Sequence, residues 1–311
     1  MSSQASWQSA FDLWLASLRS EHTRRAYGQA FADLQRFRGN ADLQAVNRSD
    51  VARWMEDMRA RGLSAPTIAQ RLAAVSAFYR YAEFTFEDLQ QKNPAAVKDR
   101  PKVTPYGKAN YLSANEARAL LRAINRKTLQ GRRDYALFLG YLFTGRRNSE
   151  WRRVRWGDFV NKGSKVMYRW SGKGKSDVLS ELPPPVWNSI LELLKADGRH
   201  ATIQPGDYVF APFADPLRRK TGWDTSRPVG DREVLQLMKR YGKRAGLNPV
   251  NLKVHMLRHS ATMLRKEAGD DVETICKFLG HSNIAITQIY LHQVEGRADQ
   301  SWMSVAQMLG I

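Results

Sequence analysis

The chain has 311 residues and carries 49 Lys and Arg against 30 Asp and Glu, a net charge of +19. Such an excess favours a polyanionic partner, because phosphates that the protein neutralises release their counterions; the alternative is a basic surface without such a partner. No apolar run approaches the ~20 residues of a membrane span, and the lone Cys276 excludes an internal disulfide.

The first residues also lack the basic start and apolar core of a signal peptide. We therefore expect a cytoplasmic protein with no membrane partner. The thiol of Cys276 lies among apolar neighbours in the sequence VETICKFLG, which favours a packed side chain over a reactive one.

The positive charge is concentrated in one part of the chain. Residues 101–180 hold 18 basic and 5 acidic residues, a net +13, whereas residues 1–100 (14 against 11) and 181–311 (17 against 14) each hold +3. A solvated surface would spread its charge, and a nucleic-acid footprint concentrates it. The distribution therefore strengthens the expectation of a nucleic-acid partner.

The first part of the chain shows the spacing of short amphipathic helices. Trp7, Phe11 and Trp14 recur at three- and four-residue steps, which places them on one helix face. The same analysis predicts helices over residues 5–19, 22–37, 51–62 and 64–84. Four short helices with short connections form a compact bundle, and we expect their aromatic rings in its core and not on a base-stacking surface.

Residues 88–110 lose this periodicity and contain three prolines and five basic residues, which is typical of an exposed linker. The length of the chain favours two domains, and we place them at 1–87 and 111–311. In the second domain the pattern predicts a strand pair around a glycine-rich turn within 166–183 and helices over 112–124, 132–143, 226–247, 255–269, 271–280 and 282–292. This domain is therefore mainly helical with one small antiparallel sheet.

Four short motifs in the second domain combine residue types suited to phosphate chemistry. They are TGRRNSE with Arg147, SGKGKSD with Lys173, HMLRH with His255 and Arg258, and LGHSNIAITQIY with His281 and Tyr290. Each motif alone is weak, since a Gly-Lys turn is usually a solvated hairpin and a lone tyrosine usually packs. Their order and spacing give them weight together.

In this order the motifs resemble the tyrosine recombinase (phage integrase) family. The resemblance is specific over the second domain and looser over the first, which is similar to the helical, SAM-like core-binding domain of that family. It implies a mainly α fold, with a DNA breaking-rejoining catalytic domain after the core-binding bundle. It also implies a site-specific DNA recombinase of the Xer type or a small integrase.

The resemblance assigns a role to each motif residue. Tyr290 would be the nucleophile that forms a 3′-phosphotyrosyl link, and Arg147 and Arg258 would bind the non-bridging phosphate oxygens. Lys173 would be the general acid for the leaving 5′-oxygen, with Lys175 as the second choice. His255 and His281 would complete the pocket.

The reaction requires positive charge beside the phosphate and a base beside the phenol, and these residue types supply both. Phosphoryl transfer builds negative charge on the equatorial oxygens, which guanidinium groups meet in a bidentate manner. A phenol with a pKa near ~10 is a poor nucleophile at neutral pH and needs a neighbouring base. An aryl phosphodiester conserves the bond energy, so we expect no metal ion, no ATP and no other cofactor.

The sequence departs from the family pattern at two positions. Arg146 stands where an apolar residue is usual, and Trp151 stands where leucine is usual. The sequence leaves two interpretations of Arg146 open, an added DNA contact or a side chain that folds outward. The apolar residues of the last segment, around Trp302 and Met308, fit a helix that docks either on a neighbouring protomer or on its own domain.

Three rival functions are weighed against this one. His255 and His259 have the spacing of a helical zinc pair, but no glutamate follows His255 and Arg258 would stand beside the cation. A DNA-binding or architectural protein without activity, and a type IB topoisomerase, share parts of the pattern.

The expected partners are double-stranded DNA with a specific target site and further copies of the chain in a tetramer. The target sequence, any accessory factors and the choice among integration, excision and chromosome dimer resolution stay open.

Overall fold

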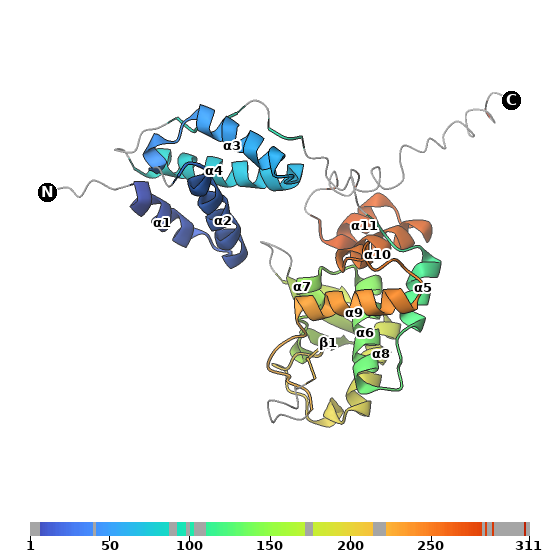
Figure 1. Cartoon of the computed structure of the whole chain (residues 1–311). Helices are drawn as coiled ribbons and strands as arrows, with labels where there is room; N and C mark the ends of the chain where they lie inside the picture. The colour runs from blue at the N-terminus through green and yellow to red at the C-terminus, as the bar shows by residue number, and fades with distance from the viewer. Residues whose placement is uncertain are drawn as a thin grey trace. The chain divides into compact units, whose positions relative to one another are not determined.

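The computed structural model describes most of the chain, over residues 7–39, 42–86, 92–97, 100–102, 110–171, 177–213 and 222–281, with Ile284, Gln288 and Met308. Two compact units are separated between Thr104 and Pro105, within the segment that the sequence predicts as a linker. Their helices and strands are drawn in Figure 1.

The first unit is a bundle of helices, as the spacing of apolar residues predicts. Its elements are α1 (Trp7–Ser17), α2 (Glu21–Phe37), the short 3-10 helix η1 (Leu43–Ala45), α3 (Arg48–Ala60) and α4 (Ala65–Thr85). Ser20 caps α2 by accepting a hydrogen bond from the amide of Thr23. Asn47 and Asp50 form a capping box at the start of α3. These caps explain why the helices begin where the sequence predicts, within about three residues.

Aromatic rings fill the core of this bundle. Trp14 of α1, Phe31 of α2 and Phe78 of α4 are at most 4% exposed. The ring of Phe78 lies 5.4 Å from that of Trp14 and 5.3 Å from that of Phe31. The expectation that the aromatic rings lie in the core is confirmed for these three, and it is wrong for Phe37 and Phe84, which are 36% and 94% exposed.

A single buried carboxylate joins three helices of the first unit. Asp33 of α2 accepts hydrogen bonds from Nε1 of Trp54 at 3.0 Å and from both terminal nitrogens of Arg61 at 2.9 and 2.8 Å. Arg71 of α4 also donates to it. The hydrogen bonds from Arg61 are the main cause that lowers the pKa of Asp33 to about 2. Asp33 is therefore ionised and ties α3 and α4 to α2.

Part of the predicted linker packs on the first unit instead of standing exposed. Pro94 and Ala95 are buried, and Nδ2 of Asn93 donates to Oγ of Ser76 on α4 at 2.8 Å. The expectation of an exposed segment is thus wrong for these residues. The side chain of Asn93 also accepts from the amide of Ala95, which forms a local turn that proline composition alone does not reveal.

The second unit is mainly helical with one sheet, as expected. Its helices are α5 (Ala114–Arg122), α6 (Leu129–Thr144), α7 (Asn148–Trp151), α8 (Pro184–Ala196), α9 (Asp231–Arg244), α10 (His255–Glu267) and α11 (Val272–Leu279), with short 3-10 helices η2 (Trp156–Asp158) and η3 (Arg199–Ala201). The strands are β1 (Phe159–Lys162), β2 (Lys165–Ser171) and β3 (Asp177–Glu181), paired antiparallel in the order β1-β2-β3. β2 and β3 are the predicted strand pair; β1 and α8 were not predicted.

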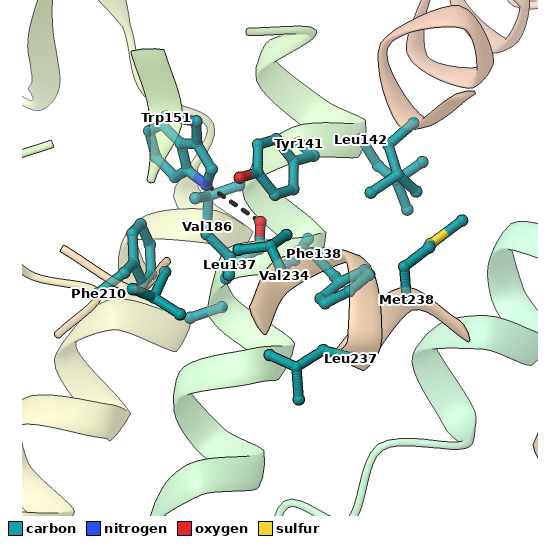
Figure 2. Packing of buried hydrophobic residues seen from close by; sticks show 14 of the residues in the cluster. Leu137, Phe138, Tyr141, Leu142, Trp151, Val186, Phe210, Val234, Leu237 and Met238 are labelled. Carbon is teal, nitrogen blue, oxygen red and sulfur yellow. Dashed lines mark hydrogen bonds between the residues drawn. The ribbon is translucent and has the colours of Figure 1, made fainter. Parts of the chain in front are cut away.

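Helix α6 forms the centre of the second core, where its apolar residues meet side chains from α7, α8 and α9 (Figure 2). Trp151 of α7 is 1% exposed, and its Nε1 donates to the carbonyl oxygen of Leu137 at 3.1 Å. A Cβ atom on Gly140 would lie 2.1 Å from the Trp151 ring. The glycine therefore makes room on α6 for the tryptophan ring.

Candidate active site

The first side of the site is the loop between α6 and α7. Gly145 ends α6 in the left-handed conformation, with φ +60°, and a Cβ atom there would lie 2.6 Å from the ring of Phe278. Both facts require glycine at this position. The loop then delivers Arg147, whose Nη1 donates to Oε1 of Glu150 at 2.8 Å while its amide donates to Oε2 at 2.9 Å. Glu150 thereby fixes both the backbone and the guanidinium of Arg147.

The second side is one face of α10. His255, Arg258, His259 and Thr262 recur at steps of three and four residues, so a single helix face carries them all. The rings of His255 and His259 are edge to face with centroids 4.6 Å apart. Oγ1 of Thr262 donates back to the carbonyl oxygen of Arg258 at 2.9 Å, which satisfies the hydroxyl inside the helix.

The third side is the end of α11. Gly280 ends this helix with φ +66°, and the amide of His281 donates to the carbonyl oxygen of Cys276 at 3.1 Å. This turn directs the chain so that Nε2 of His281 lies 3.1 Å from Nη2 of Arg258. Since a guanidinium group only donates, Nε2 accepts, and the neutral His281 ring carries its proton on Nδ1.

Arg258 joins the second and third sides to the first. Its side chain is nearly buried, the residue being 5% exposed. Nη1 donates to the carbonyl oxygen of Gly145 at 2.6 Å, and Nη2 donates to that of Leu279 at 2.9 Å. The buried charge is therefore stabilised by peptide carbonyls at the ends of two helices, where the helix dipole is negative.

These three sides enclose a small cavity of about 110 Å³. That volume is well below the roughly 300–1,000 Å³ typical of pockets for whole small molecules, so the cavity suits a single chemical group. Its lining is strongly basic, with two arginines and three histidines. The lining residues are Arg147, His255, Arg258, His259, Thr262, Leu279 and His281.

Burial and neighbouring cations keep two of these histidines neutral. Burial is the main cause that lowers the pKa of His255 below its usual value, and the charges of Arg258 and Arg147 act in the same direction. Burial, followed by His255 and Arg258, lowers the pKa of His259 to about 4. At neutral pH the imidazoles are therefore able to accept a proton, while the positive charge of the cavity resides on the arginines.

The structure brings together four of the six residues that the sequence singles out, namely Arg147, His255, Arg258 and His281. Lys173 and Tyr290 lie outside the described residues, as does the predicted C-terminal helix except Met308. β2 ends at Ser171 and β3 begins at Asp177, on either side of the segment that contains Lys173.

Besides Thr262 and Leu279, two titratable residues of the site were missed by the sequence analysis. Glu150 served there only to align the motif, although its position three residues after Arg147 is the spacing of a helical ion pair. His259 was considered only as a zinc ligand. Within the described ranges, no group of three or more His, Cys, Asp or Glu side chains is arranged to hold a metal ion.

Family models match both units of the chain. The model of the phage integrase family covers residues 110–297, which is more than half of the chain, and the model of the phage integrase N-terminal SAM-like domain covers residues 10–84. The chain belongs to the phage integrase family. The resemblance that the four motifs carry is thereby confirmed, together with the mainly helical, two-part fold that it implies.

Relatives of this integrase-family chain include several proteins named tyrosine recombinases. It is 29% identical to tyrosine recombinase XerD of Caulobacter vibrioides over 298 residues, covering 94% of this chain and 93% of the relative. It is 27% identical to tyrosine recombinase XerA of Pyrococcus furiosus over 241 residues, covering 78% of this chain and 74% of the relative. The first of these similarities spans both units.

Solved structures share the fold of this integrase-family chain. A lambda integrase dimer bound to a COC′ core site matches with a TM-score of 0.71 at 16% identity, covering 94% of this chain and 97% of that one. XerH recombinase bound to a palindromic difH substrate matches with a TM-score of 0.69 at 16% identity, covering 93% of this chain and 79% of the XerH chain. Among the described residues no helix has the length and apolar character to cross a membrane.

Proposed function

We propose that the chain is a site-specific DNA recombinase that cleaves and rejoins DNA through a 3′-phosphotyrosyl bond to Tyr290. The observation that carries the proposal is the convergence of Arg147, His255, Arg258 and His281 on one small cavity. They come from three separate stretches of the chain. A basic cavity sized for one group, in a chain of this family, is suited to a phosphodiester.

The two arginines supply the positive charge for the reaction. Arg147 is held by Glu150 at the rim, with a side chain that is 39% exposed, and Arg258 lies deeper, held by the carbonyl oxygens of Gly145 and Leu279. As the phosphorus is attacked, negative charge grows on its equatorial oxygens. Cations fixed before the reaction stabilise that charge without having to reorganise.

The remaining steps are proton transfers. The phenol of Tyr290 must lose its proton as it attacks, and the neutral imidazole of His255 is suited to accept it. The 5′-oxygen must gain a proton as it leaves, and we assign this step to Lys173, in the segment between β2 and β3. His281 hydrogen-bonds Arg258 and helps to orient it.

The partner in this proposal is double-stranded DNA with a specific target site, and the working form is a tetramer on two such sites. Several relatives are named recombinases, and one solved neighbour is a lambda integrase tetramer bound to a Holliday junction. Because two arginines and a lysine provide the charge, neither a metal ion nor ATP takes part.

Covalent trapping tests the proposal. The chain is first used to enrich its binding sequence from a randomised duplex pool, and the enriched duplex is then nicked so that a cleaved strand diffuses away. We expect a protein–DNA adduct that survives denaturation and maps to Tyr290 by mass spectrometry. Absence of any adduct, or one on another residue, contradicts the proposal.

A matched pair of variants separates binding from chemistry. Tyr290→Phe removes one oxygen and leaves the ring, so DNA affinity should persist while the adduct disappears. Lys173→Ala should form the adduct slowly and regain speed when the leaving 5′-oxygen is replaced by sulfur, since a thiolate leaves without a proton. Relaxation of supercoiled plasmid with no paired-site complex would indicate a topoisomerase instead.

A further inference from the structure

Arg146 precedes the proposed phosphate ligand Arg147 and stands where the family usually has an apolar residue. The structure excludes both interpretations that the sequence leaves open, because Arg146 is only 2% exposed. It neither folds outward nor reaches a DNA surface. Burial lowers the pKa of its guanidinium from the usual range. Burying a charged group costs free energy, so the contacts that the group makes there need an explanation.

The guanidinium of Arg146 connects two parts of the site. Nε donates to the carbonyl oxygen of Thr144 at 3.0 Å, at the end of α6. Nη2 donates to the carbonyl oxygen of Phe278, near the end of α11. Arg146 thus joins the loop that carries Arg147 to the helix that leads into His281.

Arg258 makes the same connection one residue further along both segments. It binds the carbonyl oxygens of Gly145 and Leu279, whereas Arg146 binds those of Thr144 and Phe278. The two arginines therefore bind consecutive carbonyl oxygens at the end of α6 and consecutive carbonyl oxygens at the end of α11, and each arginine joins one helix end to the other. We call this arrangement the double arginine bridge.

An aromatic ring from the sheet closes the bridge on one side. The guanidinium carbon of Arg146 lies 3.6 Å from the ring centroid of Trp170 on β2, close enough for a cation–π interaction. A Cβ atom on Gly280 would lie 2.3 Å from the same ring. Trp170 thus contacts both Arg146 and the glycine turn that immediately precedes His281.

Within the described part of the chain, Nη1 of Arg146 is buried without a hydrogen-bond partner. A buried guanidinium with one unsatisfied nitrogen is costly, and apolar residues of similar volume are often as stable or more stable at such places. We therefore expect the stacking and the two carbonyl contacts of Arg146 to fix the positions of the segments that they join more than to increase the folding stability of the chain.

We propose that Arg146 is a positioning residue for strand cleavage and that it acts through His281. The inference rests on the proposed function. Arg146 holds the end of α11 at Phe278, and Trp170 holds the turn at Gly280. His281 is thereby kept at the distance where Nε2 accepts from Arg258, which in turn orients Arg258 toward the phosphate.

The test uses the full chain with Arg146→Met, which keeps an apolar stem and removes the guanidinium. Single-turnover adduct formation on the nicked, enriched duplex gives an amplitude, which reports the folded fraction, and a rate constant, which reports the geometry. We expect an unchanged amplitude and a rate constant lowered at least about tenfold, as small displacements of catalytic groups produce. Arg146→Lys keeps the charge but lacks the planar fork of donors and the stacking face of the guanidinium, so its rate constant should fall between those of Arg146→Met and the unmodified chain.

Arg133→Met is the matched control, since Arg133 is also buried, at 3% exposed. It also donates to a carbonyl oxygen, that of Ala211, and its guanidinium lies 5.6 Å from the Trp223 ring. Its ion pairs are with Asp134 and Glu233, so none of these contacts involves the loop of Arg147 or α11. Its loss should lower the melting temperature or the amplitude and leave the rate constant alone. An Arg146→Met variant that loses amplitude only, or that loses nothing, overturns the inference.

A second readout does not depend on cleavage. Nitrogen NMR of the His281 ring should show the proton on Nδ1 in the unmodified chain and a mixture of tautomers in Arg146→Met, with Arg133→Met unchanged. An unaltered His281 signal in Arg146→Met overturns the inference even if the rate falls. A chain that forms no adduct at all contradicts the proposed function, while the NMR result still decides the role of Arg146.

Discussion

Single residues decide how this chain departs from its family. Trp151 replaces a leucine that is usual there, and Gly140 on the facing turn of α6 leaves the space that the larger ring fills. Arg146 replaces an apolar residue and is surrounded by Trp170, Phe278 and helix-end carbonyls. Each unusual residue thus has a local partner that makes it tolerable.

The Gly140–Trp151 contact gives a stability prediction. Gly140→Ala should lower the free energy of unfolding by at least about 2 kcal/mol, because the new Cβ would overlap the indole ring in a filled core. Thermal unfolding of the full chain measures it. The control is Gly28→Ala on α2, where the nearest atom would lie 3.9 Å away and better helix propensity should be neutral or stabilising.

The double variant Gly140→Ala, Trp151→Leu completes this test. Leucine vacates the space that the alanine methyl group needs, so the pair should be more stable than Gly140→Ala alone. If Gly140→Ala and the double variant lose the same free energy of unfolding, overlap with the Trp151 ring is not the cause of the loss.

The neutral state of His259 predicts acid sensitivity of the site. Its pKa is lowered from 6.5 to about 4 in the folded chain, so the unfolded chain binds the proton first as the pH falls. The contribution of His259 to stability should be constant above pH 6.5, decline between pH 6.5 and about 4, and level off below. His259→Asn should weaken that decline in urea midpoints measured at pH 7.5, 5.5 and 4.5, whereas the exposed His22→Asn should not.

At the scale of elements, charged side chains determine how helices are held together. Asp33 gathers arginines and a tryptophan from neighbouring helices in the first unit. In the second unit, Arg152 connects α7 to Asp231 at the start of α9, with Nε 2.8 Å from Oδ1. These contacts lie between different elements, so a helix pattern alone does not reveal them.

Asp33→Asn tests this role of a buried carboxylate. The amide would leave Arg61 and Arg71 without their shared charge. Breaking a fully buried pair typically costs about 3–5 kcal/mol, and we expect less here because the Arg61 side chain is 38% exposed. The stabilisation by Asp33 should be present above pH 3.8 and lost as the pH falls toward about 2, because its pKa is lowered over that range. Circular dichroism during urea unfolding measures the loss, and Asp12→Asn on the exposed side of α1 should cost little.

The sequence predicts elements well where local signals agree. The helices of the first unit, the helix predicted over 112–124 and the pairing of β2 with β3 are all confirmed. Helix α8 was missed because Pro183, Pro184 and Pro185 indicate a break, although proline is tolerated in a first turn. The motifs predict which residues meet in the cavity, but only tertiary structure shows that Arg146 is buried beside it.

At the scale of the whole molecule, composition overstates the charge available to a partner. Residues 101–180 hold a net +13, yet Arg133, Arg146 and Arg152 in this range are at most 5% exposed. These guanidinium groups hold helices and loops instead of facing solvent. The remaining exposed cations of this range are the ones that can neutralise phosphates.

The proposed chemistry predicts that cleavage needs no divalent ion. Arg147, Arg258 and Lys173 provide the charge that magnesium provides in other phosphoryl transfers. Adduct formation on the nicked duplex should therefore proceed at the same rate with and without excess EDTA. A loss of the chemical step on chelation that returns with added magnesium would contradict the assignment, and DNA affinity measured in parallel separates chemistry from binding.

In the proposed mechanism, the double arginine bridge makes the last turn of α11 part of the site that cleaves DNA. Helix ends fray readily, yet here the final carbonyl oxygens are the acceptors that hold Arg146 and Arg258. Each opening of that turn therefore releases both guanidinium groups and His281 together. The exchange of the His281 amide proton, which is bound to the carbonyl oxygen of Cys276, should then report the fraction of time in which the cavity is assembled.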